Sequence, residues 1–221
     1  EQDKEAIPLF ESVIANVSTP LAPHAAFRCG EAFLRLKEDD KAAARFMLFI
    51  DQPAFQNLPG LSDRGLLRLG FAQAQQGQHA ESQKTCALVI TRFPRSPFLV
   101  EAHFAQGQAL QSQKQFDAAI KAYAAVIAAS ANEYAARAQF QIGRCRMEKK
   151  LYPEAVQDFL KVVYTYDYPV WSASALCQAA DASLAQKKTK EAGEFLQRVL
   201  TEFSKTSYAK LAKEQLDKLP K

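Results

Sequence analysis

The chain has 221 residues, of which 48% are hydrophobic and 24% are charged, so it can bury a sizeable core. Its 28 Lys and Arg residues against 24 Asp and Glu give a net charge of only +4, dispersed along the chain, which argues against a nucleic-acid-binding protein. No apolar run approaches the ~20 residues that cross a bilayer, so we expect no direct membrane insertion.

Apolar residues recur with the period of an α-helix from one end of the chain to the other. We expect a lone helix at 3–16, another at 206–218, and five helical pairs between them. The predicted pairs are 24–37 with 40–51, 62–76 with 79–92, 97–112 with 116–129, 133–148 with 153–165, and 171–186 with 189–203. Pro53, Pro59 and Gly60 place the longest loop at 52–61. Ser96 as an N-cap with Pro97 at the first helical position predicts a helix start at 97.

The two single helices are expected to play different parts. The last one has an apolar stripe and a lysine-rich opposite side, as the cap of a helical array requires; its stripe is Tyr208, Leu211, Ala212, Leu216 and Leu219. The first one resembles the second helix of a pair, with an apolar face of Ile7, Phe10, Val13 and Ile14. We therefore expect the chain to be a fragment of a longer protein whose preceding helix is missing.

Three columns of similar residues repeat along the chain at intervals of 36 to 40 residues. The first is glycine, the second is a small residue twelve positions later, and the third is mostly aromatic, four positions further on. We expect the glycine to let two helix backbones approach, the small residue to face it, and the aromatic residue to fill the adjacent space. Such self-similarity indicates a solenoid of stacked helical pairs. The columns are Gly30, Gly70, Gly107, Gly143 and Ala180; then Ala42, Ser82, Ala119, Ala155 and Ala192; then Phe46, Cys86, Tyr123, Phe159 and Leu196.

These columns resemble the signature of the tetratricopeptide repeat, in which Leu-Gly is followed by an aromatic residue, Ala, a second aromatic residue and a small apolar residue. Leu69-Gly70 and Ile142-Gly143 show the beginning of the signature most clearly, and the resemblance covers nearly the whole chain. It implies an all-α, right-handed superhelical solenoid of about five pairs plus a single helix at each end, forming one domain over 1–221. It also implies a non-catalytic protein-interaction scaffold that needs no cofactor.

Every repeat is longer than the family's basic 34 residues, so the extra residues must lie between one pair and the next. Lengthened repeats with the Phe-Pro-x-Ser-Pro junction at 93–97 resemble a bacterial envelope branch of the family. That branch includes periplasmic cell-division coordinator proteins and outer-membrane assembly lipoproteins, which favours the periplasm or cell envelope and a part in envelope assembly. Unpaired cysteines favour a reducing compartment, so the cytoplasm stays the alternative.

Few residues of the sequence are candidates for catalysis or metal binding. The cysteines are spread over four repeats without metal or redox spacing, and we expect them to be unbridged and structural. The histidines have no ligand-like neighbours, and no phosphate loop, serine elbow or carboxylate pair is present. The pattern predicts no enzyme, metal site or cofactor. The residues concerned are Cys29, Cys86, Cys145 and Cys177, and His24, His79 and His103.

The resemblance places a concave groove along the first helices of the pairs. It implies that an amphipathic helix or extended apolar peptide of another protein binds there. The Lys and Asn pair with which some members grip a terminal carboxylate is absent. The predicted groove residues are Phe27, Glu31, Leu67, Phe71, Phe104, Gln108, Phe140, Arg144 and Met147, and the same positions also give Leu34, Arg35, Ala74, Gln75, Gln111, Ser112, Glu148, Cys177, Asp181, Leu184 and Ala185. In the alternative interpretation, the phenylalanines at 27, 104 and 140 only pack between neighbouring helices.

A second candidate interaction patch is the aromatic run Tyr164, Tyr166, Tyr168 and Trp171. The alternative is that Trp171 and one tyrosine seal the junction between two repeats. Two functions stay open at this point. The chain is either a scaffold that binds a segment of another protein, or a structural module that self-associates or packs against a further domain.

Overall fold

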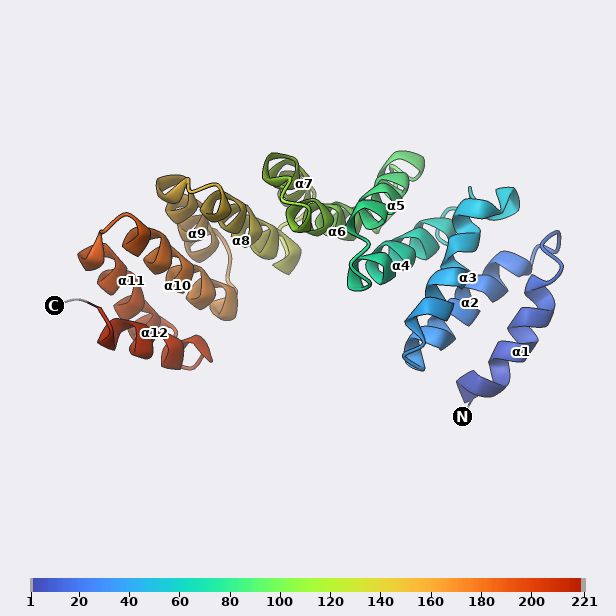
Figure 1. The fold of residues 1–221 in the computed structure, drawn as a ribbon, viewed down its shortest axis with the longest axis horizontal. Helices are drawn as coiled ribbons and strands as arrows, with labels where there is room; N and C mark the ends of the chain where they lie inside the picture. Colours follow the sequence, from blue (N-terminus) through green and yellow to red (C-terminus); the bar gives the residue numbers. More distant parts are fainter. Residues whose placement is uncertain (1, 220–221) are drawn as a thin grey trace. The chain divides into compact units, whose positions relative to one another are not determined.

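The computed structural model describes residues 2–219, and these residues form α-helices and one short 3-10 turn without any β-strand (Figure 1). The chain divides into two compact units, 1–113 and 114–221. Unit 1 contains α1 (Gln2–Ile14), α2 (Ala22–Arg35), α3 (Asp39–Asp51), the 3-10 turn η1 (Pro53–Phe55), α4 (Ser62–Gln75), α5 (His79–Arg92) and α6 (Leu99–Ser112). Unit 2 contains α7 (Phe116–Ala129), α8 (Glu133–Glu148), α9 (Tyr152–Thr165), α10 (Pro169–Ala185), α11 (Thr189–Glu202) and α12 (Tyr208–Asp217).

The predicted helices are confirmed, with ends that differ by about two residues. The predicted start of α6 at Pro97 is wrong, because the helix begins at Leu99. Ser96 instead stabilises the turn before it: its Oγ accepts a hydrogen bond from the Phe98 backbone N–H at 3.1 Å and donates one to Asp63 Oδ2 at 2.6 Å. The prediction of a single domain over 1–221 rests on the unbroken repeat register and stays a prediction.

The turn inside each helical pair has the same length and the same backbone geometry. One residue in each turn has a left-handed conformation, with φ between 59° and 75°. In the turn after α8, Lys150 N–H donates to Met147 O at 2.9 Å and Leu151 N–H donates to Arg146 O at 2.9 Å, which is the Schellman pattern that ends a helix. Glycine suits this position best, yet four of the five turns use lysine. The left-handed residues are Lys37, Gly77, Lys114, Lys150 and Lys187.

The glycine column lies against the ring of the aromatic column within a pair. A Cβ added to Gly30 would lie 2.6 Å from Phe46, and one added to Gly143 would lie 2.6 Å from Phe159, closer than real Cβ contacts. The small residue takes part as well, because Ser82 Oγ donates to Gly70 O at 2.7 Å. The sequence interpretation thus found the right residues but exchanged two roles: the ring, more than the small residue, is what needs the glycine.

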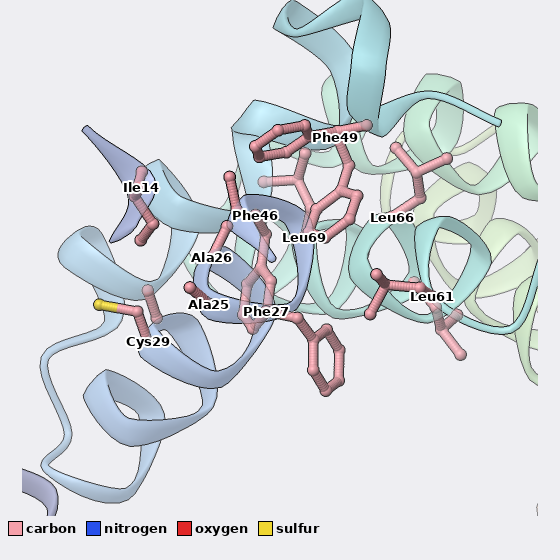
Figure 2. Close-up of a cluster of buried hydrophobic side chains, with 14 of the residues drawn as sticks. Ile14, Ala25, Ala26, Phe27, Cys29, Phe46, Phe49, Leu61, Leu66 and Leu69 are labelled. Atoms are coloured by element: carbon pink, nitrogen blue, oxygen red, sulfur yellow. The ribbon is translucent and has the colours of Figure 1, made fainter. Parts of the chain in front are cut away.

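Phenylalanine rings also fill the core of unit 1 between successive pairs (Figure 2). Phe49 of α3 lies against Gly65 of α4, where an added Cβ would be 2.5 Å from the ring. Phe55 of η1 is fully buried, with its ring centroid 5.8 Å from that of Phe49. The long loop expected at 52–61 is therefore part of the core, because its 3-10 turn carries an aromatic side chain back onto α3.

Unit 2 combines an apolar core with one buried ion pair. Asp158 of α9 is 2% exposed, and Arg146 Nη1 of α8 lies 2.7 Å from its Oδ2. Gln139 Nε2 donates to the other oxygen, Oδ1, at 3.1 Å, and Lys161 Nζ lies 3.4 Å from the same atom, whereas Oδ2 has the ion pair with Arg146 but no hydrogen bond. At the end of the unit α12 packs on α11 and α10, as expected of a cap. Leu211 departs from the predicted stripe, since it is exposed.

We predict that Gly143→Ala lowers the free energy of unfolding by about 1–3 kcal/mol, because its methyl group would overlap the Phe159 ring. Gly193→Ala is the matched control in unit 2. An added Cβ at Gly193 would lie 3.4 Å from Leu219 Cδ1, which is an ordinary contact. Because alanine has a higher helix propensity than glycine, this substitution should leave the free energy of unfolding unchanged or raise it by up to ~1 kcal/mol. Urea denaturation measures both; equal effects would contradict the assignment of Gly143 to a close contact.

We also predict that Lys150→Gly stabilises the protein by about 0.5–1 kcal/mol. The substitution removes the cost of a left-handed side-chain residue and adds the smaller entropic cost of glycine. Lys150→Ala removes the same charge but keeps the strained backbone, so its midpoint of thermal unfolding should not rise. If both variants raised the midpoint of thermal unfolding equally, the cause would be the lost charge and not the left-handed backbone conformation.

Candidate functional site

Unit 1 contains a cleft of about 510 Å³ that lies along its first helices. Leu34 of α2, Phe71 of α4 and Ala109 of α6 lie on three successive first helices, and His79 at the start of α5 also lines the cleft. A volume of this size is typical of sites that hold a ligand or several side chains of a peptide. The lining residues are Leu34, Arg68, Phe71, Ala72, Ala74, Gln75, His79, Gln108, Ala109 and Ser112.

Helical spacing explains why α4 contributes most to this cleft. Arg68, Phe71 and Gln75 are three and four residues apart, so they share one face of the helix. Leu67 and Leu66 point into the core on the neighbouring faces and fix the rotation of α4. Alanines at 72, 74 and 109 leave space beside the half-buried Phe71 ring, which thus forms an apolar floor that solvent reaches.

The rim of the cleft is polar, and most of its charge is already balanced. Arg68 Nε lies 2.8 Å from Glu31 Oε1, and this ion pair joins α4 to α2. Gln75, Gln108 and Ser112 offer amide and hydroxyl groups. His79 Nδ1 is buried and has no hydrogen-bond partner among residues 2–219. Neutral donors and acceptors around an apolar floor can bind the backbone and one large apolar side chain of a polypeptide.

The residues predicted for the groove divide into buried and accessible sets. Phe27, Leu67, Phe104 and Phe140 are at most 6% exposed, so their rings and side chains belong to the packing between helices. Glu31, Phe71 and Gln108 lie at the unit 1 surface, and the last two line the cleft. In unit 2, Arg144 is exposed on α8, whereas Met147 is half-buried and packs against the unit 2 core.

The aromatic run at 164–171 does not form one patch. Trp171 packs against Phe140 with ring centroids 5.5 Å apart, and its indole N–H donates to Glu133 Oε1 at 2.9 Å, so it joins α10 to α8. Tyr164 is 70% exposed, but its hydroxyl accepts a hydrogen bond from Arg198 Nη1 at 2.9 Å. Tyr166 and Tyr168 are half-buried. These contacts agree with the interpretation of Trp171 as a seal between repeats.

The sequence interpretation missed Arg68, Ala72, Ala109 and His79 as lining residues. Arg68 could have been found, because it precedes Phe71 by three residues and therefore shares its helical face. His79 could not, because it belongs to a second helix and reaches the cleft only through the geometry of the turn at 76–78.

The four cysteine thiols are part of the packed core, where their reactivity is low. All four cysteines are free and buried. Burial raises the pKa of Cys29 and Cys177 to about 11 and that of Cys86 and Cys145 to about 12, which disfavours the reactive thiolate. Within residues 2–219 no cluster of three His, Cys, Asp or Glu side chains could hold a metal ion. None of the helices described is both long and apolar enough to cross a membrane.

Comparison with known sequences identifies the repeat. A model of the tetratricopeptide repeat matches residues 4–48 and 104–169, which is half of the chain, and a second model of the same repeat matches 64–96. The chain belongs to the tetratricopeptide repeat family. Proteins of this family are protein-interaction scaffolds and are generally not enzymes. No curated protein matches the chain.

Solved tetratricopeptide repeat structures share the fold at low sequence identity. MamA from Desulfovibrio magneticus RS-1 is 19% identical with a TM-score of 0.68, over 83% of this chain and 95% of MamA. The C-terminal part of a repeat protein from Cytophaga hutchinsonii is 16% identical with a TM-score of 0.69, over 90% and 74%. YrrB, described as having an unusual peptide-binding site, is 15% identical with a TM-score of 0.67, over 92% and 96%. The predicted all-α solenoid is thereby confirmed; the envelope branch is not.

We predict that the native protein reacts slowly with iodoacetamide at pH 8. Raising a thiol pKa from 9.0 to about 11 lowers the thiolate fraction roughly 100-fold, and burial also blocks access. After denaturation without reductant, intact mass should show four labels. Two labels or fewer would reveal a disulfide, and rapid labelling of the native protein would contradict the buried placement.

Proposed function

We propose that the chain is a non-catalytic scaffold and that the cleft of unit 1 binds a segment of another protein. The observation that carries the proposal is the accessible apolar floor around Phe71, surrounded by Gln75, Gln108 and Ser112. A first-helix surface that contacted only solvent would be polar. Exposed apolar surface of this kind marks interaction sites. The family supports the scaffold role, and YrrB is a relative in fold whose description includes a peptide-binding site.

The sharpest test places a photo-reactive residue in the cleft. The crosslinker p-benzoylphenylalanine at position 108 should capture a partner from a lysate of the source cells, whereas the same residue at exposed Lys84 on α5 should not. Crosslinked peptides identified by mass spectrometry report which partner segment was held. Equal capture at the two positions, or capture only at position 84, would show that the cleft is not the binding site.

A side-chain truncation measures the contribution of the apolar floor. Phe71→Ala should weaken binding of a captured partner segment by about 30-fold, which corresponds to ~2 kcal/mol for a well-packed anchor. Leu88→Ala on the second helix α5 is the control, because Leu88 is half-buried in the core of unit 1 but does not line the cleft. Isothermal titration calorimetry on variants of native-like circular dichroism distinguishes the two; equal losses would exclude Phe71 as an anchor.

Self-association is the alternative use of this protein. Leu9 of α1 and Leu21 before α2 are 69% and 64% exposed, and they are the observation in its favour. Light scattering after size-exclusion chromatography should nevertheless give the mass of a monomer near 24.6 kDa if the cleft serves a different protein. A dimer that persists on dilution would support the self-associating module.

A place in bacterial envelope assembly is the finer form of the proposal. Its support is the lengthened repeat and the junction at 93–97, whereas the four free cysteines favour a reducing compartment such as the cytoplasm. Fractionation of the source cells, with a periplasmic and a cytoplasmic marker, tests it directly.

A further inference from the structure

Arg64 of α4 is an arginine whose orientation is fixed by aromatic rings. Its guanidinium carbon lies 4.6 Å from the ring centroid of Phe27 and 5.9 Å from that of Phe98. The residue is exposed, and within residues 2–219 the two ring contacts are the interactions that its guanidinium makes. The two cation–π contacts restrict the side chain, so less of its conformational entropy is lost when an anion binds to the guanidinium.

The acidic groups nearby are already engaged. Asp63 is 1% exposed and accepts hydrogen bonds from Ser96 Oγ at 2.6 Å and from the Arg64 backbone N–H at 3.0 Å. Glu31 is paired with Arg68. No carboxylate among residues 2–219 forms an ion pair with the Arg64 guanidinium, so its N–H donors are available to an incoming anion.

The same face of α4 connects this cation to the cleft. Four side chains form one stripe along α4, because they follow one another at intervals of four, three and four residues. They are Arg64, Arg68, Phe71 and Gln75. Seven residues separate Arg64 from Phe71, which is about 10 Å along the helix axis. Exposed Arg28 and His24 occupy the corresponding positions on α2 and make this end of the face more basic.

We propose that the segment bound in the cleft is acidic, with a carboxylate held by Arg64 and a large apolar side chain lying against Phe71. The proposal rests on the proposed function of the cleft and specifies its ligand. The 10 Å separation corresponds to about three residues of an extended peptide or seven of a helical one. An acidic side chain is favoured over a basic or neutral one because charge-assisted hydrogen bonds to a fixed guanidinium are the strong ones.

Selection from a displayed library of random 12-residue peptides against the full chain tests the proposal. We expect enriched peptides with Asp or Glu three or seven residues from a large apolar residue. Arg64→Gln should then weaken the binding of a selected synthetic peptide about tenfold or more. Arg64→Lys should restore only part of this loss, because lysine keeps the charge without the stacked fork. Arg92→Gln, at an exposed position at the end of α5, makes the same change of charge and should leave the affinity unchanged.

The outcomes separate this inference from the proposed function. If selected peptides lose affinity with Phe71→Ala but show no acidic preference, or if Arg64→Gln and Arg92→Gln behave alike, the cleft still binds peptides and the inference about Arg64 is overturned. If no selected peptide depends on Phe71, the proposed function fails and the inference fails with it. Raising the salt concentration should weaken binding to the parent more than to Arg64→Gln, since only the parent keeps the ion pair.

Discussion

A close contact between a glycine on a first helix and a side chain on the second helix is the constraint on which the helical pairs depend: Gly30 faces Phe46, Gly143 faces Phe159, and Gly70 faces Cys86. At Gly30 and Gly143 the ring occupies the space that a Cβ would need, so the helices approach more closely than any other residue would allow. Gly65 repeats the arrangement between pairs, against Phe49. Interiors are packed as densely as crystals, so one methyl group at such a contact forces the helices apart. The accessible face of α4 depends on such contacts on both sides, because Gly65 packs against Phe49 of α3 and Gly70 against Cys86 of α5.

The cleft of unit 1 follows from that arrangement. The core phenylalanines are turned inward, and the next accessible positions on the same helices carry Phe71, small alanines and neutral polar groups. Strained turns at Lys37, Lys150 and Lys187 hold the second helices at a fixed distance from the first at some cost in stability. The site is therefore made by rigid helices rather than by loops, which favours a preformed groove over one that folds around its ligand.

The fold could be predicted from the sequence because the same pattern occurs five times. One occurrence would be weak evidence for a helical pair, but five in register are strong evidence. The glycine and aromatic columns located every pair, and Pro53 and Gly60 located the long loop. The site was less predictable. Exposure depends on how the neighbouring helices pack: the side chains three residues before each glycine, such as Phe27, are buried, whereas Phe71, one residue after Gly70, lines the cleft. The stacking of Arg64 needs Phe27 and Phe98, which come from two other helices and share no local pattern with it.

The most direct test of the account is amide chemical-shift mapping of the whole 24.6 kDa chain on addition of a peptide selected against it. The account predicts shifts that concentrate on α4 and α6 around Phe71, Gln108 and Ser112 and extend along α4 to Arg64, with little change on the outer side of α5. Shifts confined to second helices, or to the exposed leucines beside α1, would contradict a binding site on the first-helix face.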